Sequence, residues 1–260
     1  MLYVAIRAAR KAGDMIARAY DERDKLKVTQ KSDRDYVTEV DRRAESLIVR
    51  EISRHYPEHG IVAEESAEQV NPEAAIQWYI DPLDGTTNFI HGYPHFAVSI
   101  AAWKLGKPLF AVVHDPIRDE TFEAKNGGGA FLNRRRLRVS GEKQLDHALF
   151  ASGLPSYRRE TIDLFQQRMD ACMRNMDGYR RGGSAALDLA YVAAGRLDAY
   201  WEAGLGAWDI AAGVLLVQEA GGLVTGLDGA TVELARGDVL ASNSHLHGQV
   251  MSLLKVDSTR

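Results

Sequence analysis

Two aspartates three residues apart end a short apolar run between residues 78 and 89, which reads WYIDPLDGTTNF. The carboxylates of Asp81 and Asp84 are the ligand type that a hard cation such as Mg²⁺ prefers. The following turn, from Gly85 to Thr87, is predicted to open a short helix whose free amides suit a phosphate. Metal ligands beside a phosphate cradle are what phosphoryl transfer requires. Asp-Pro and Asp-Gly are also frequent turn formers, so a turn explains this stretch better when it is taken alone.

Further acids stand at the ends of other predicted elements. Glu64 and Glu65 follow the apolar residues 61–63, Asp209 begins an apolar helix, Asp41 precedes another helix, and Glu202 ends a strand. Taken alone, Asp41 and Asp209 are explained equally well as helix caps. Acids that recur at the ends of several elements are, however, how a metal site is assembled from distant residues. The whole set therefore favours a metal site.

The elements that must position these acids are helices and strands in mixed order. Apolar residues at helical spacing predict helices over residues 2–20, 41–55, 162–176, 184–195 and 208–220. Short apolar runs predict strands at 60–63, 76–80, 96–103, 109–114, 147–153 and 197–202. Residues 25–35 are predicted to form a loop or hairpin.

The polar stretch 140–146 marks the expected division of the chain. The half 1–142 carries most of the metal-ligand candidates and the phosphate-binding turn, and the half 143–260 carries Asp209 and Glu202. We expect both to form one compact unit in which helices pack on mixed sheets.

Composition excludes some classes of partner. The 260 residues carry 36 acids and 32 bases, a net charge of −4, which gives no general attraction to nucleic acid or to an anionic membrane. No apolar run reaches the ~18–20 residues that span a bilayer, and charges such as Arg7 and Lys11 interrupt any signal-peptide core. Cys172 is the single cysteine, so no intramolecular disulfide forms. We expect a cytoplasmic protein.

Several segments together resemble the inositol monophosphatase family, and bacterial members most of all. The two signature regions are DPLDGTTNF at 81–89 and WDIAAG at 208–213; DYVTEVD at 35–41, AEES at 63–66 and GSAALDLA at 183–190 also match. The resemblance covers nearly the whole chain. It implies the layered α/β/α/β/α sugar-phosphatase fold, a homodimer, and lithium-sensitive hydrolysis of inositol monophosphate that uses two or three Mg²⁺ ions.

The resemblance also implies roles for the matched acids. Glu64, Asp81 and the backbone carbonyl of Leu83 would hold one Mg²⁺. Asp81 would bridge to a second ion, held also by Asp84 and Asp209. Such ions can lower the pKa of bound water to as little as ~7 and stabilise both the attacking and the leaving oxygen.

A second group of residues is implied to handle the water and the substrate. Thr86 and Asp41 would orient and deprotonate the water. The Gly85 and Thr86 amides would hold the phosphate, with Asp84 also facing the substrate, while Ala185 and Glu202 would contact the inositol hydroxyls. Glu65 is expected to lie behind the ligands. Lys31 receives no role, because its spacing to Asp41 is shorter than in the family.

Two other functions remain open at this point. One is hydrolysis of another small phosphate, such as fructose bisphosphate, a nucleotide bisphosphate or NADP. The other is a regulatory role, because bacterial members of the family are associated with transcription antitermination through RNA polymerase and Nus factors. An intact set of acids favours catalysis without excluding a second function.

The remaining conspicuous residues are expected to be structural. We expect His245 and His247 on a solvated surface, and packing or surface positions for His91 and His95. The basic residues from Arg134 to Arg138 are expected on a solvated edge strand, and Arg180 and Arg181 in surface pairs rather than against an anionic ligand. Cys172 is expected to be buried, and Asp188 to have a hydrogen-bond partner within its buried helix.

Overall fold

The computed structural model describes residues 1–23, 28–32, 35–66, 69–154 and 161–255. Its larger sheet has seven strands in the order β3-β4-β5-β6-β7-β8-β9. Only the first pair is parallel, and the other neighbours are antiparallel. The strands are β3 (Gly60–Ala63), β4 (Ile76–Asp84), β5 (Ala97–Lys104), β6 (Lys107–Asp115), β7 (Glu120–Lys125), β8 (Gly129–Leu132) and β9 (Arg135–Arg136).

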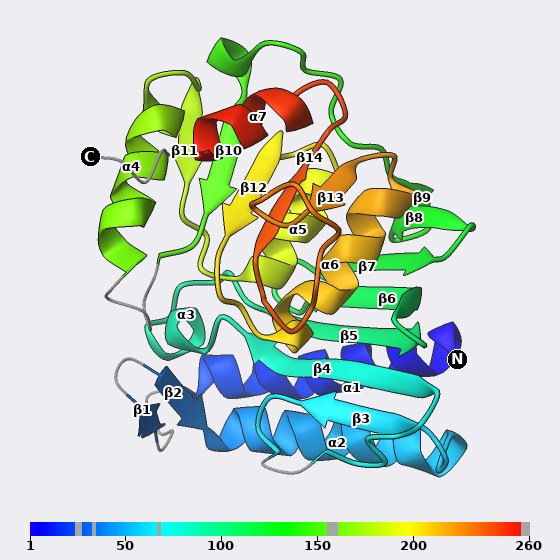
Figure 1. The fold of residues 1–260 in the computed structure, drawn as a ribbon. Helices are drawn as coiled ribbons and strands as arrows, with labels where there is room; N and C mark the ends of the chain where they lie inside the picture. Colours follow the sequence, from blue (N-terminus) through cyan, green and yellow to red (C-terminus); the bar gives the residue numbers. More distant parts are fainter. Residues whose placement is uncertain (24–27, 33–34, 67–68, 155–160, 256–260) are drawn as a thin grey trace.

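Two helices, α1 (Leu2–Asp21) and α2 (Glu39–His55), cover one face of this sheet (Figure 1). Their apolar stripes, which include Ile16 and Ile48, are fully buried against the strands. The hydroxyl of Thr38 caps α2 by accepting from the Val40 amide at 3.0 Å. Ahead of α2 lies a hairpin of β1 (Val28–Ser32) and β2 (Asp35–Thr38).

A second helical layer, α5 (Ala185–Ala193) and α6 (Ala207–Glu219), separates the larger sheet from a five-stranded one (Figure 1). Both helices are apolar on nearly all sides because both of their faces are covered. The smaller sheet has the order β11-β10-β12-β14-β13. Its strands are β10 (Leu149–Ser152), β11 (Gly178–Arg180), β12 (Ala199–Glu202), β13 (Leu223–Thr225) and β14 (Val239–Ser242).

The last layer consists of α4 (Ile162–Met173) and α7 (His247–Leu254), which cover the outer face of the smaller sheet (Figure 1). Two short helical elements, α3 (Thr86–Ile90) and η2 (Leu145–His147), complete the set. The layers follow one another as α/β/α/β/α, which confirms the fold class. None of the described helices has both the length and the apolar character needed to cross a bilayer.

The structure corrects some element boundaries. β4 continues past Ile80 to Asp84, so both signature aspartates belong to a strand and not only to a turn. Strands β13 and β14 and helix α7 were not predicted, because their polar flanks hide short apolar segments such as 239–241. The division of the chain at residue 142 stays a prediction. One apolar cluster contains residues from both halves, so the two halves share part of their core.

Candidate active site

The carboxylates of Asp81, Asp84 and Asp209 converge, each with an oxygen within 4.8 Å of the others. Residues three apart on a regular strand point to opposite faces. In β4 the pairing with β5 shifts between Asp81, opposite Ser99, and Asp84, opposite Ala97. This bulge lets both aspartates face one site.

Asp209 reaches the same site from the first turn of α6. The Gly206 amide donates to Asp209 Oδ2 at 2.6 Å, so the carboxylate also caps its own helix. The Ser99 hydroxyl donates to the Trp208 carbonyl at 3.1 Å and thereby joins the start of α6 to β5. The cap and the metal ligand are therefore compatible roles for Asp209.

Asp84 is held by the N-terminus of α5. The Ser184 hydroxyl and the Ala186 amide both donate to Asp84 Oδ2, at 2.6 and 2.7 Å. Because both bonds go to one oxygen, the second oxygen can serve a ligand.

Without a bound cation, ionisation of the three acids is energetically unfavourable. Burial, and then repulsion from Glu64, Asp84 and Asp209, raises the pKa of Asp81 well above its usual value. Burial raises the pKa of Asp84 to about 6 and, with repulsion from Asp84, that of Asp209 to about 8.

These acids fit a divalent cation. Within the described residues, no lysine or arginine forms an ion pair with Asp81, Asp84 or Asp209. A bound cation would favour their charged forms and remove the repulsion. Oxygen donors without nitrogen or sulfur are typical of Mg²⁺, Ca²⁺ and Mn²⁺ sites.

Glu64 and Leu83 border the cluster. Glu64 follows β3, and its amide donates to the Ile80 carbonyl at 3.1 Å. Its carboxyl is close enough to raise the pKa of Asp81. The Leu83 amide donates to Asp81 Oδ1 at 2.9 Å, which fixes the orientation of that carboxylate.

Thr86 and Asp41 form a connected pair beside the cluster. Thr86 Oγ1 lies 2.8 Å from Asp41 Oδ1 and 3.0 Å from the Leu83 carbonyl, and its single proton can serve one of them fully. The other Asp41 oxygen accepts from the Thr38 amide at 2.9 Å. Burial raises the pKa of Asp41.

Gly85 allows the chain to turn from β4 into α3. Its φ of 96° lies in the left-handed region that other residues avoid. A Cβ there would also lie only 3.0 Å from the His95 carbonyl. The turn that presents the Gly85 and Thr86 amides therefore requires glycine.

Glu202 ends β12 (Ala199–Glu202), close enough to Asp209 to contribute to its raised pKa. The Tyr200 hydroxyl donates to Glu202 Oε2. Glycine at 153 leaves the carboxylate its space, since a Cβ there would lie 1.9 Å from Oε1. Burial raises the pKa of Glu202 to about 7. Ala185, at the start of α5, is 7% exposed.

Comparison with known proteins agrees with this geometry. The profile of the inositol monophosphatase family matches residues 1–257. The chain belongs to that family. Membership supports a metal-dependent phosphatase, and the cluster at Asp81, Asp84 and Asp209 supplies acidic ligands for a metal.

Individual relatives are similar over almost their whole length. The Nus factor SuhB of Pseudomonas aeruginosa is 51% identical over 248 residues, which cover 94% of this chain and 92% of the relative. The solved extragenic suppressor protein SuhB of Bartonella henselae is 43% identical, with a TM-score of 0.94 and 97% of each chain covered. The inositol monophosphatase of Anabaena is 40% identical, with a TM-score of 0.88 and coverage of 97% and 94%.

The structure adds positioning residues that were not predicted. Glu45, buried on α2, accepts from the Glu65 amide at 2.7 Å and from the Ser66 hydroxyl, and so shapes the turn after Glu64. Glu45 lies four residues after Asp41, so both side chains are on the same face of α2, and this spacing could have predicted its position near the site. Asn88 donates to the carbonyls of His95 and Gly182 at 2.7 and 2.9 Å, joining α3 to the segment before α5.

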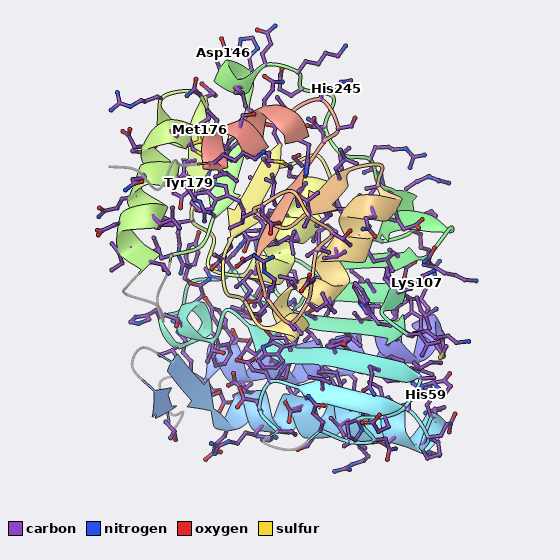
Figure 2. The ribbon with its side chains drawn as sticks, in the orientation of Figure 1. His59, Lys107, Asp146, Met176, Tyr179 and His245 are labelled. Atoms are coloured by element: carbon purple, nitrogen blue, oxygen red, sulfur yellow. The ribbon has the colours of Figure 1, made fainter. Side chains whose placement is uncertain are left out.

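Among the histidines, one prediction was wrong. His247 is buried, not solvated: Ser242 Oγ lies 2.8 Å from its Nδ1 and Thr225 Oγ1 lies 3.1 Å from its Nε2. His245 is exposed at the surface (Figure 2), as is His91, and His95 is buried.

Other structural expectations have mixed outcomes. The carboxyl group of Asp188 has no hydrogen-bonded partner among the described residues; its Oδ1 lies 3.9 Å from His95 Nε2. Cys172 is buried, and burial raises its pKa to about 11. The basic run lies exposed at the sheet edge formed by β9. The side chain of Lys31 lies outside the described residues.

Proposed function

We propose that this protein hydrolyses a phosphate monoester of a small polyol, inositol monophosphate above all, with Mg²⁺ as its cofactor. The convergence of Asp81, Asp84 and Asp209 carries the proposal. Three mutually repelling acids, two of them buried, are stable together only with protons or a cation between them. The identity of the Anabaena relative as an inositol monophosphatase supports the substrate.

Two metal positions are proposed from the arrangement of the acids. Glu64, Asp81 and the Leu83 carbonyl would hold one Mg²⁺. Asp81, Asp84 and Asp209 would hold another. The resemblance to the family implies two or three ions in all. Bound there, Mg²⁺ would supply positive charge beside the phosphate and lower the pKa of the attacking water.

Thr86 and Asp41 are proposed to handle the proton of that water. When Thr86 Oγ1 donates to Asp41 Oδ1, its lone pairs can accept a hydrogen bond from water. The proton then passes through Thr86 Oγ1 to Asp41, whose raised pKa makes it a better base than an exposed aspartate. The amides of Gly85 and Thr86 would bind the phosphate oxygens.

Glu202 and Ala185 are proposed to contact the leaving polyol, and Asp84 to face it as well. A carboxylate at Glu202 accepts hydrogen bonds from hydroxyls and repels a second phosphate. This preference argues against fructose bisphosphate, nucleotide bisphosphates and NADP as better substrates.

Phosphate release from inositol monophosphate, sugar phosphates and nucleotides, measured with and without metal, tests the proposal. We expect release to stop in EDTA and return with Mg²⁺, while Ca²⁺ supports it poorly because its looser coordination misplaces the water. The exposed Asp14→Asn variant controls for general effects of losing a carboxylate. Full activity without metal would contradict the proposal, and a better bisphosphate substrate would contradict the role of Glu202.

A second function is supported by the Nus factor SuhB relative at 51% identity. We propose that this chain also binds RNA polymerase or a Nus factor through its outer surface, as a cytoplasmic homodimer. Exposed apolar residues on α4, such as Leu164 and Met173 at 39% and 58% exposure, offer a protein-binding surface. Hydrolysis and this binding would use different parts of the molecule.

A further inference from the structure

The segment between β12 and α6 is short and rich in glycine. Residues 203–206, named here the bridge, read Ala-Gly-Leu-Gly. Gly204 has a φ of 74°, in the left-handed region that other residues avoid. At Gly206, a Cβ would lie 2.6 Å from the ring of Trp208. Both positions therefore favour glycine, which leaves the bridge with little stiffness of its own.

The loop between β13 and β14 reaches the start of α6 and holds the bridge there (Figure 1). The Gly204 amide donates to Asp238 Oδ1 at 3.1 Å, and the Leu205 amide donates to the Gly237 carbonyl at 3.0 Å. Gly237 is buried, and a Cβ there would lie 1.9 Å from the Leu205 carbonyl oxygen. The two segments are thus in close contact just beyond the last paired residues of β12 and β14.

The last residue of the bridge orients a carboxylate of the acidic cluster. The Gly206 amide donates to Asp209 Oδ2 at 2.6 Å. A displacement of the bridge would move this amide and so change the orientation of the Asp209 carboxylate. Mg²⁺ demands near-ideal octahedral geometry, so a small change in a ligand's orientation weakens its binding.

Arg236 holds the Asp238 side chain from the other side. Its guanidinium donates to Asp238 Oδ2 at 3.4 Å and to Asp228 Oδ2 at 2.8 Å. The two oxygens of Asp238 are therefore divided between Arg236 and the amide of Gly204. Asp228 binds the same arginine without contacting the bridge through any hydrogen bond found among the described residues, which makes it a matched control.

We propose that Asp238 is a positioning residue for Mg²⁺, which holds the bridge so that Asp209 keeps the orientation that binds the metal. This inference rests on the proposed function, because it requires Asp209 to be a metal ligand. The oxygen of Asp238 that accepts from Gly204 carries the effect, and the negative charge of Asp238 does not. Asp238 lies outside both signature regions, 81–89 and 208–213.

Calorimetric titration of the metal-free full chain with Mg²⁺ tests the inference without any substrate. We expect Asp238→Ala to raise the dissociation constant of Mg²⁺ at least ~3-fold, the scale of one modest hydrogen bond. Asp238→Asn keeps an oxygen acceptor for the Gly204 amide and should bind Mg²⁺ as the wild type does. Gly237→Ala changes no charge but pushes the Leu205 carbonyl away, so it should weaken Mg²⁺ binding at least as much. Asp228→Ala should leave the constant unchanged.

Kinetics separate this role from a contact with the substrate. Phosphate release by Asp238→Ala should need at least ~3-fold more Mg²⁺ for half its maximal rate and should recover at saturating Mg²⁺. The ratio of kcat/KM for inositol monophosphate to that for p-nitrophenyl phosphate should stay at its wild-type value, because the bridge acts on the metal and not on the polyol.

The outcomes distinguish this inference from the proposed function. A wild type that binds no Mg²⁺ would contradict the proposed function and this inference with it. Wild-type binding with an unchanged constant in Asp238→Ala would overturn this inference alone, and a lower Tm in that variant would then show a merely structural role. Equal weakening by Asp238→Ala and Asp238→Asn would also overturn it, because the loss of charge would explain the effect. If Gly237→Ala does not fold by circular dichroism, the two Asp238 variants decide.

Discussion

Replacing Asp84 by asparagine should stabilise the metal-free protein. Burial raises the pKa of this carboxyl from 3.8 to about 6, a difference that corresponds to about 3 kcal/mol. The folded protein binds the proton more tightly than the unfolded chain does, so ionisation destabilises the fold. This loss of stability begins as the pH rises through 3.8 and is complete above about 6.

The expected net gain is smaller than that figure. Ser184 and the Ala186 amide donate to Asp84 Oδ2, and their bonds to a neutral amide oxygen would be weaker by about 1 kcal/mol in total. We therefore expect Asp84→Asn to raise the free energy of unfolding by about 2 kcal/mol at pH 8, or about 4–8 °C in Tm. At pH 5 the electrostatic part should fall to about half, because the folded carboxyl is then largely protonated.

Thermal unfolding in EDTA at pH 5 and pH 8, followed by calorimetry, measures both values. Asp14→Asn, at an exposed position on α1, is the matched control and should change Tm little. Saturating Mg²⁺ should shrink the difference, because the wild type gains about 2.7 kcal/mol at one hundred times its dissociation constant and the variant, which lacks one ligand charge, gains less. An Asp84→Asn protein no more stable than wild type at pH 8 in EDTA would refute the reasoning.

Three further outcomes test the proposed functions. Glu202→Gln should lower kcat/KM for inositol monophosphate by a factor that corresponds to ~1–3 kcal/mol while sparing p-nitrophenyl phosphate, so an unchanged ratio of the two constants would remove Glu202 from the substrate site. LiCl should inhibit phosphate release more than NaCl at equal ionic strength, and identical curves would count against Li⁺ replacing Mg²⁺ at the acids. Asp84→Asn should lower turnover at least ~10²-fold, yet the variant should still pull down RNA polymerase or a Nus factor from bacterial lysate. If neither the wild type nor the variant pulls down such a partner, hydrolysis is the only supported function.

The sequence alone determined most of the elements and the candidate acids. Helices α1, α5 and α6 could be predicted because α1 buries a long apolar stripe and α5 and α6 are apolar throughout. Both patterns are visible in the local sequence. The family and the layered fold also followed from motifs at 81–89 and 208–213. These features depend on residues that are neighbours along the chain.

Tertiary structure decided how those acids meet. The bulge that turns Asp81 and Asp84 to one side arises from the pairing of β4 with β5, which local sequence does not encode. Ser184 holds Asp84 across 100 residues of chain, and His247 is buried only because β13 and β14 bring Thr225 and Ser242 to it. A hydrogen bond between distant segments, or the burial of a side chain between them, depends on how the layers pack. The apolar pattern of a strand depends only on its own residues.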